Sequence, residues 1–248
     1  RYTSEGGWYE CDKIRFRQGT PEKIGGWQRI SSTTFQGVCR SLWNWVTLGS
    51  QNLIAVGTNL KYYIELGGVY NDITPLRATV TLTNPFETTS GSPVVVVTDA
   101  NSGYTDGDFV TYSGASAVGG LTLNGEYQIT LTTTTNEYTI DAGSAASSTA
   151  TGGGTVTAAY QINVGTAFAI PLTGWGSSTW SSGTWGVGQA SSESLRLWSQ
   201  SNFGEDLVFG PRGGGLYYWD ATGGTSARAV ELSTLGGASN VPTSQKLI

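Results

Sequence analysis

Two stretches of this chain, far apart in the sequence, carry the same order of strand and turn signals. Each begins with Leu-Trp, passes through a polar turn into a short apolar run that ends in Gly, and finishes with an aromatic strand. The first lies at residues 42–63 and the second at residues 197–219. Three short strands in so few residues are typical of an antiparallel meander, and repeated aromatic meanders suggest β-propeller blades. Two units make a short repeat, so a chance similarity between them stays open as the alternative.

The residue types available favour strands over helices. Only 12% of the 248 residues are charged, whereas 36 are Gly and 11% are aromatic. An amphipathic helix needs a charged outer face, which this chain can rarely supply. Short, turn-rich strands need Gly in the turns and aromatic or β-branched residues between them. The sequence therefore predicts an all-β fold with partial, propeller-like meander blades.

The middle of the chain differs in composition from both meanders. No Trp lies between positions 46 and 174, and residues 78–160 carry seven acidic side chains and no basic one. Surface loops tolerate insertions because closing a longer loop costs little extra entropy. We therefore predict three parts: an N-terminal strand region with the first meander (1–76), an inserted acidic domain (77–160), and a Trp-rich loop with the second meander, continuing the first (161–248).

The insert carries its own strand signals, separated by turn signals such as Asn124-Gly125 and Thr135-Asn136. Several of its segments alternate between apolar and polar residues, as a half-buried strand does. The expected strands are Ala78–Thr83, Val94–Thr98, Asp108–Tyr112, Gly125–Thr130, Glu137–Asp141 and Gly154–Tyr160. Six short strands predict a small β-sandwich or barrel.

Residues 171–188 place a Trp at every fifth position, at Trp175, Trp180 and Trp185. A spacing of five fits neither the helical nor the strand period. The plainer interpretation is a Gly-hinged loop whose indoles pack on a blade edge. The alternative is an aromatic platform for sugars or for a neighbouring subunit, because Trp is enriched at interface hot spots.

A basic cluster near the N-terminus comprises Lys13, Arg15, Arg17 and Lys23. Lys13, Arg15 and Arg17 alternate with apolar residues, which predicts three cations on one face of a strand. The plainer interpretation is a solvated face or a salt-bridged subunit contact. The alternative is a face turned toward DNA phosphates, which attract Lys and Arg regardless of base sequence. The net charge of −5 argues against tight DNA binding.

The sequence gives little support for catalysis or for a bound cofactor. The chain has no His, so the usual proton shuttle and the commonest metal ligand are missing. Glu205 and Asp206 are adjacent, and neighbours on a strand point to opposite faces, so they would not flank one glycosidic bond. Asp106 and Asp108 do not follow the order of an EF-hand calcium loop and predict a turn. We predict no enzyme activity, no metal and no cofactor.

Cys11 and Cys39 are too few for a disulfide scaffold, and we expect free, buried thiols, with Cys39 as a small core residue. No apolar run is long enough to cross a membrane as a helix.

Several segments resemble a family of phage virion proteins. They are the opening Gly7–Arg17 with Pro21–Trp27, the runs Leu195–Gln200 and Phe203–Phe209, and the pair Gly174–Gly176 and Gly183–Gly186. The insert stretch Asp106–Ala115 is similar to a β module of phage structural proteins. Together they resemble the propeller-containing tail proteins of short-tailed bacteriophages, namely the tail nozzle (tail tubular protein B) and packaged-DNA stabilisation proteins.

This resemblance implies a virion tail protein that forms a homo-oligomeric ring below the portal and adaptor, with the portal, the adaptor and the tail fibres as its partners. Such a ring extends the DNA channel, closes it before DNA ejection, and makes weak contact with packaged DNA. One departure matters, since a propeller usually has at least four blades and this chain supplies about two. A carbohydrate-binding module of a tail fibre or adhesin is the alternative function, and a glycan-degrading tailspike is a weaker third.

Overall fold

The computed structural model describes residues 10–26, 28–29, 31–100, 103–163, 165, 195–245 and 248. These residues form strands, turns and two single-turn 3₁₀ helices, η1 (Ala221–Gly223) and η2 (Leu232–Thr234). The all-β fold predicted from the scarcity of charge and the abundance of Gly is confirmed.

The first meander folds as a four-stranded antiparallel sheet, here called the first meander sheet. Its strands are β3 (Cys39–Val46), β4 (Asn52–Thr58), β5 (Tyr62–Leu66) and β6 (Val69–Asp72), paired in chain order. The sequence predicted the first three. The fourth follows a tight turn at Gly67 and Gly68, which both have positive φ, a conformation open to Gly at little cost.

The second meander folds in the same way and is here called the second meander sheet. Its strands are β15 (Trp198–Phe203), β16 (Asp206–Pro211), β17 (Tyr217–Trp219) and β18 (Val230–Glu231), also paired in chain order. Two segments that resemble each other in sequence therefore share one topology.

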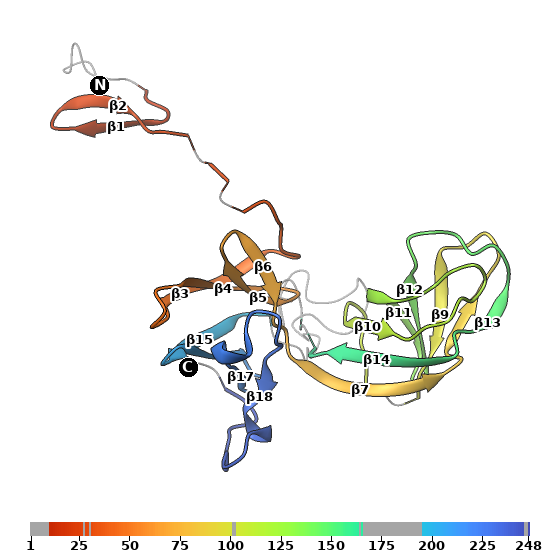
Figure 1. Cartoon of the computed structure of the whole chain (residues 1–248). Helices are drawn as coiled ribbons and strands as arrows, with labels where there is room; N and C mark the ends of the chain where they lie inside the picture. Colours follow the sequence, from red (N-terminus) through yellow and green to blue (C-terminus); the bar gives the residue numbers. More distant parts are fainter. Residues whose placement is uncertain are drawn as a thin grey trace, which may run out of the picture.

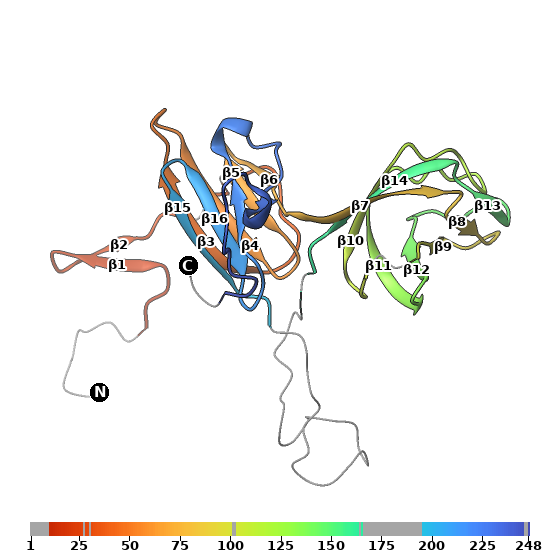
Figure 2. The same ribbon diagram turned by 90° about the horizontal axis from the view of Figure 1, so that it is seen from below.

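The two meander sheets lie face to face and share one hydrophobic core (Figures 1 and 2). The ring of Tyr62 from the first sheet stacks on Phe209 from the second, with centroids 4.0 Å apart and an interplanar angle of 16°. The residues of this core are Trp45, Leu53, Ala55, Tyr62, Ile64, Ile73, Ile162, Trp198, Leu207, Phe209, Trp219 and Ala229. Burial of so many aromatic side chains from both sheets gives this pair a stiff, continuous interior.

Residues 76–161 form a nearly closed antiparallel barrel of eight strands, seen at the right of Figure 2. The strands are β7 (Leu76–Thr83), β8 (Phe86–Thr88), β9 (Val94–Thr98), β10 (Phe109–Ser113), β11 (Gly125–Thr134), β12 (Glu137–Asp141), β13 (Ala150–Gly152) and β14 (Thr155–Gln161). Their order in the sheet is β13-β8-β9-β12-β11-β10-β14-β7.

The two strands beyond the six expected arise at a corner of the barrel. β7 and β8 are consecutive in the chain, and they pair with the consecutive strands β14 and β13. At the bend, Asn84 and Gly154 exchange hydrogen bonds: the Asn84 N–H donates to the Gly154 carbonyl at 2.8 Å, and the Gly154 N–H to Asn84 Oδ1 at 3.0 Å. Both residues have positive φ, and the bend separates the short strands β8 and β13 from the longer strands β7 and β14.

The barrel interior contains a chain of tyrosine hydroxyls. Tyr112 and Tyr138 lie 2.5 Å apart at their hydroxyl oxygens, Tyr138 and Tyr160 lie 2.7 Å apart, and Tyr160 donates to Asp99 Oδ2 at 2.5 Å. All four residues are buried, so each polar tip needs a partner inside the core. Burial raises the pKa of all three tyrosines above their ordinary value.

Residues 10–26 form an arm that projects from the body of the chain (Figure 1). Its strands β1 (Ile14–Arg17) and β2 (Thr20–Lys23) make a two-stranded hairpin. The two turn residues, Gln18 and Gly19, both have positive φ, as the tightest hairpin turns require.

The expectation for the cysteines is wrong: Cys11 and Cys39 are both free but both exposed. Cys11 lies in the arm. Cys39 begins the edge strand β3 at an irregularity in the register between Cys39 and Ser41, so it escapes the shared core.

Candidate functional site

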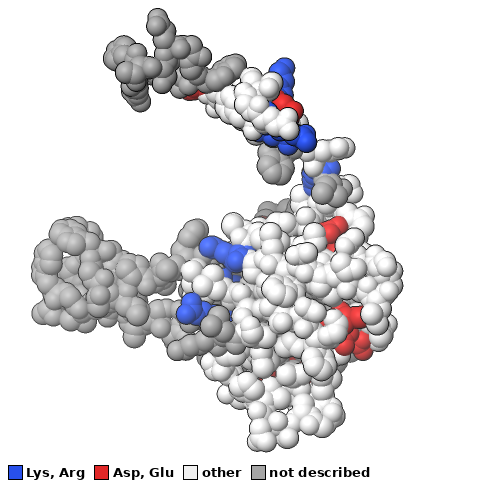
Figure 3. All heavy atoms as spheres, turned by 90° about the vertical axis from the view of Figure 1, so that its left-hand side faces the viewer, with Lys and Arg blue, Asp and Glu red and all other residues white. Residues whose placement is uncertain are grey.

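The arm carries all four residues of the basic cluster (Figure 3, top). Arg15 and Arg17 lie two positions apart in β1 and so share a face, as predicted. Lys13 precedes the strand with a φ of 57°, and Lys23 pairs with Ile14, which places it on the face opposite Arg15. Arg15 Nη2 lies 3.1 Å from Glu22 Oε2 across the hairpin. The cluster therefore occupies one arm but two of its faces.

The three Trp residues of the predicted aromatic platform, Trp175, Trp180 and Trp185, lie outside the described residues. Their two alternative roles stay predictions.

The first meander sheet has a second face, turned away from the shared core, which we call the outer face. It carries the strand positions that alternate with the core positions: apolar Leu42, Val46, Ile54 and Val56, and polar Asn44, Asn52 and Glu65. Leu42 is 63% exposed, Val46 59% and Ile54 37%. This side of the sheet therefore carries partly open apolar side chains with polar ones between them.

The chain that leads from the arm crosses the outer face before it enters β3. This crossing segment comprises residues 28–29 and 31–38. Ser31 Oγ donates to the Gly68 carbonyl at 2.5 Å, and the Gln36 N–H donates to the Tyr63 hydroxyl at 3.1 Å. The Phe35 ring meets Tyr70 edge-on, with centroids 5.0 Å apart. Two hydrogen bonds and one aromatic contact thus anchor this crossing segment to β5, β6 and the turn between them.

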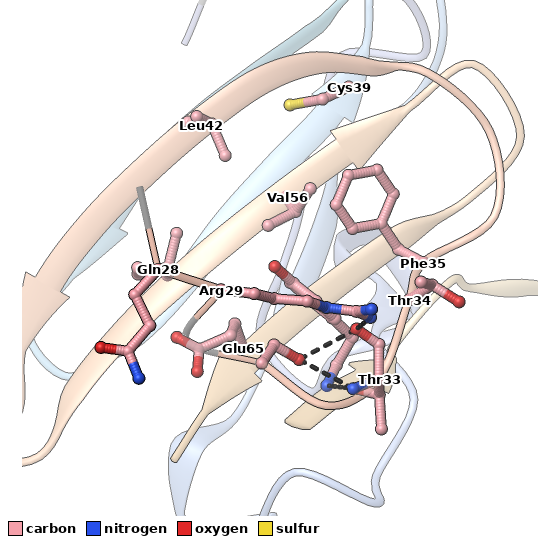
Figure 4. Close-up of a pocket in the computed structure, with 12 residues that line it drawn as sticks. Gln28, Arg29, Thr33, Thr34, Phe35, Cys39, Leu42, Val56 and Glu65 are labelled. Atoms are coloured by element: carbon pink, nitrogen blue, oxygen red, sulfur yellow. Dashed lines mark hydrogen bonds between the residues drawn. The ribbon is translucent and has the colours of Figure 1, made fainter. Parts of the chain in front are cut away.

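A groove of about 620 Å³ lies between the crossing segment and the outer face (Figure 4). It is lined by Gln28, Arg29, Ser31, Thr33, Thr34, Phe35, Cys39, Leu42, Ile54, Val56, Glu65 and Tyr70. Arg29 Nη2 donates to the Thr33 carbonyl at 2.8 Å, so its guanidinium is held within the crossing segment. The apolar lining suits an apolar or aromatic anchor with a few polar contacts at its rim.

The groove is a feature that the sequence does not predict directly, although β3 carries a signal for it. In Leu42-Trp43-Asn44-Trp45-Val46, large apolar residues occupy both alternating sets of positions. A strand with only one buried face alternates between apolar and polar residues, whereas a strand that is apolar on both sides has both faces to cover.

A buried ionic cluster joins all three parts of the chain. Lys61, whose side chain is 3% exposed, lies 3.0 Å from Asp72 Oδ2 and 2.5 Å from Glu126 Oε1 of the barrel. Arg228 of the second meander region lies 3.3 Å from Asp72, and Gln161 donates to Glu126 at 2.8 Å. Burial alone would raise the pKa of Asp72, but the two cations and the hydrogen bonds from Thr74 hold that pKa below its ordinary value.

The adjacent carboxylates Glu205 and Asp206 both make structural contacts. Glu205 accepts a hydrogen bond from the Leu48 N–H, which ties the turn of the second meander sheet to the turn of the first. Asp206 accepts from the Tyr218 hydroxyl and from the Ala221 N–H. The two carboxylates therefore serve different contacts and do not converge on one site.

Within the ranges described, no group of three or more Cys, Asp or Glu side chains could hold a metal ion. No helix in the same ranges is long and apolar enough to span a bilayer.

No protein-family model matches this chain, and no curated protein matches its sequence. Among solved structures, the chain is similar to one described as "Phage phi92 endosialidase", with 14% sequence identity and a TM-score of 0.33. The similarity covers 84% of this chain and 31% of that one, so this chain spans about a third of that structure's length. Likeness at this TM-score carries no argument about fold or function.

Proposed function

We propose that this chain is a structural subunit of a bacteriophage virion tail, assembled with further copies into a nozzle or hub ring around the DNA exit path. Its role would be mechanical. Two meander sheets with a shared aromatic core would form a stiff wall element. The ionic cluster around Lys61, here called the Lys61 cluster, would hold the barrel against it.

The observation that carries this proposal is the open apolar outer face. Soluble monomers rarely leave a contiguous apolar patch uncovered, and such patches usually mark contacts with other proteins. Here Leu42, Val46 and Ile54 are exposed on a sheet whose other face contributes Trp45, Leu53, Ala55, Tyr62 and Ile64 to the shared core. A surface of this kind is expected of a subunit that is complete only within an assembly.

The tail setting is supported by the sequence resemblance of the opening segment and of the second meander. Lys13, Arg15, Arg17 and Lys23 would contact a neighbouring subunit or the DNA in the channel. The acidic barrel, which DNA phosphates repel, would lie on the outside of the ring.

Electron microscopy of phage particles that contain this chain, with an antibody against the barrel, tests the proposal. We expect label at the tail, arranged as a ring. Label confined to free protein that purifies as a monomer, with none on the particles, would contradict it.

A carbohydrate-binding module of a tail fibre or adhesin is the second candidate. The groove favours it, because the Phe35 and Tyr70 rings lie beside polar groups of Arg29 and Glu65, a combination that suits a sugar. Binding on a glycan array that is lost with Tyr70→Ala or Trp180→Ala, together with absence from the tail ring, would favour this candidate over the first.

A further inference from the structure

The arm is an element that needs a surface to pack on. Its hairpin has two strands, and in the described part of the chain these strands pair only with each other. An isolated two-stranded hairpin is marginally stable in water. Phe16 is 52% exposed and Ile24 48%, so apolar surface of the arm remains open to a partner.

The outer face is a surface that needs an element to cover it. The crossing segment covers the β5–β6 side of this face, through Ser31, Phe35 and Gln36. The β3–β4 side keeps Leu42, Val46 and Ile54 exposed. The uncovered strip and the groove beside it therefore present the apolar surface on which such a hairpin would pack.

We propose that the arm of one copy docks on the outer face of the next copy, in the groove beside Leu42 and Ile54. The inference rests on the proposed function, since it names the contact by which the ring would be built. The arm and the outer face are different surfaces, so their contact is heterologous and joins copies head to tail. Head-to-tail contacts close into a ring when the rotation between copies allows it.

The direction of the arm supports a neighbouring copy as the occupant. The crossing segment is anchored at the groove, and from there the arm leads away from its own body (Figure 1). Gly25 and Gly26 lie in this connection, and a methyl group at either position would meet nothing within 4 Å. Both glycines therefore lie clear of the packed body of the chain.

The two native cysteines report on this contact. Cys11 lies at the base of the hairpin, Cys39 lines the groove, and both are free and exposed. In the proposed contact, Cys11 lies on the docked arm of one copy and Cys39 lines the groove of the next, so links are expected between unlike cysteines of different copies. A short bis-maleimide therefore distinguishes head-to-tail docking from other contacts.

The test uses the full chain at dilute concentration, treated with the bis-maleimide and separated under denaturing conditions. We expect a ladder of cross-linked species for the unmodified chain and, by mass spectrometry, peptides that join Cys11 to Cys39. A mixture of Cys11→Ser and Cys39→Ser chains should give dimers and nothing larger, and either variant alone should give monomers. Adducts confined to one molecule, or dimers formed by one variant alone, would overturn the proposal.

A second pair of variants distinguishes docking on the outer face from nonspecific association. Leu42→Asp places a carboxylate in the groove, and Leu48→Asp places one at a turn where the side chain is already 93% exposed. We expect Leu42→Asp to lower the cross-linked yield by about tenfold or more, because the new charge would have to be desolvated, and Leu48→Asp to leave the yield unchanged. Equal yields for both variants would refute the assigned face.

These results are independent of the test of the tail ring. Tail labelling without Cys11–Cys39 adducts would leave the proposed function standing and remove the arm contact. Cross-linked ladders without tail labelling would support the arm contact and contradict the proposed function.

Discussion

The indole N–H of Trp198, in the second meander sheet, donates a hydrogen bond to the carbonyl oxygen of Thr58, in the first, at 2.6 Å. The indole of Trp45 makes the converse contact and donates to the carbonyl of Glu205 at 2.8 Å. Trp45 and Trp198 thus each enter the shared core and anchor the polar edge of the indole on the backbone of the other meander. Hydrogen bonds of this kind fix the orientation of two packed layers, which apolar burial alone would not specify.

Replacing Trp198 by Phe should lower the free energy of unfolding by about 1–3 kcal/mol, because the variant loses a buried donor as well as packing volume. Urea denaturation followed by far-UV circular dichroism measures this change. Trp43→Phe is the matched control, since Trp43 is 37% exposed and lies outside the shared core. Equal losses in the two variants would show that the Trp198 bond contributes nothing specific.

Gly57 is the glycine that ends the apolar run of the first meander, and Trp198 lies directly against it. A methyl group added at Gly57 would lie 2.5 Å from Trp198 Cδ1. We therefore expect Gly57→Ala to destabilise the chain by about 1–3 kcal/mol through overpacking. Gly49→Ala, whose added methyl would meet its nearest atom at 3.7 Å, should change stability little when both variants are compared by thermal unfolding.

Gly57 also shows which features of the fold the sequence could predict and which it could not. The repeated Leu-Trp meanders, the all-β class and the six barrel segments follow from alternation and turn residues, which act locally. The contact between Gly57 and an indole 141 positions further along the chain does not follow from the sequence. Periodicity carries no information on which sheets pack together.

Other differences between the sequence-based expectations and the structure also arise from tertiary contacts that local patterns do not encode. The sequence analysis predicts strands at Ala78–Thr83 and Gly154–Tyr160 but not the short strands β8 and β13, which pair beyond the bend at Asn84 and Gly154. The expectation of a buried Cys39 rests on how often free Cys is buried, but this Cys begins an edge strand. The open groove depends on the path of the crossing segment, which lacks strand or helix signals.

The Lys61 cluster gives a further prediction. Lys61→Met should cost about 3 kcal/mol, because it leaves the Asp72 and Glu126 carboxylates close together without their buried cation. Equilibrium denaturation checks this loss. Lys13→Met, at a side chain that is 84% exposed, is the control and should be neutral. A neutral result for Lys61→Met would mean that Arg228 alone satisfies both carboxylates.

Alkaline pH should unfold the barrel through its tyrosine chain. Burial raises the pKa of Tyr112, Tyr138 and Tyr160 in the folded state, while unfolded tyrosines ionise near pH 10. A raised folded pKa gives stability that is complete below about pH 10 and is lost as the pH rises further. Phenolate absorbance of these residues should therefore appear together with the loss of far-UV signal. Their ionisation in a barrel that keeps its strands would contradict the burial.

The central claim is that two meanders far apart in the sequence pack on each other as one body, and a double-mutant cycle on Tyr62 and Phe209 tests it most directly. Their stacked rings lie 4.0 Å apart across the two sheets. Tyr62→Leu, Phe209→Leu and the double variant should reveal a coupling of about 0.5–1.5 kcal/mol in the free energy of unfolding. Losses that simply add, with no coupling beyond error, would mean that the two sheets do not meet.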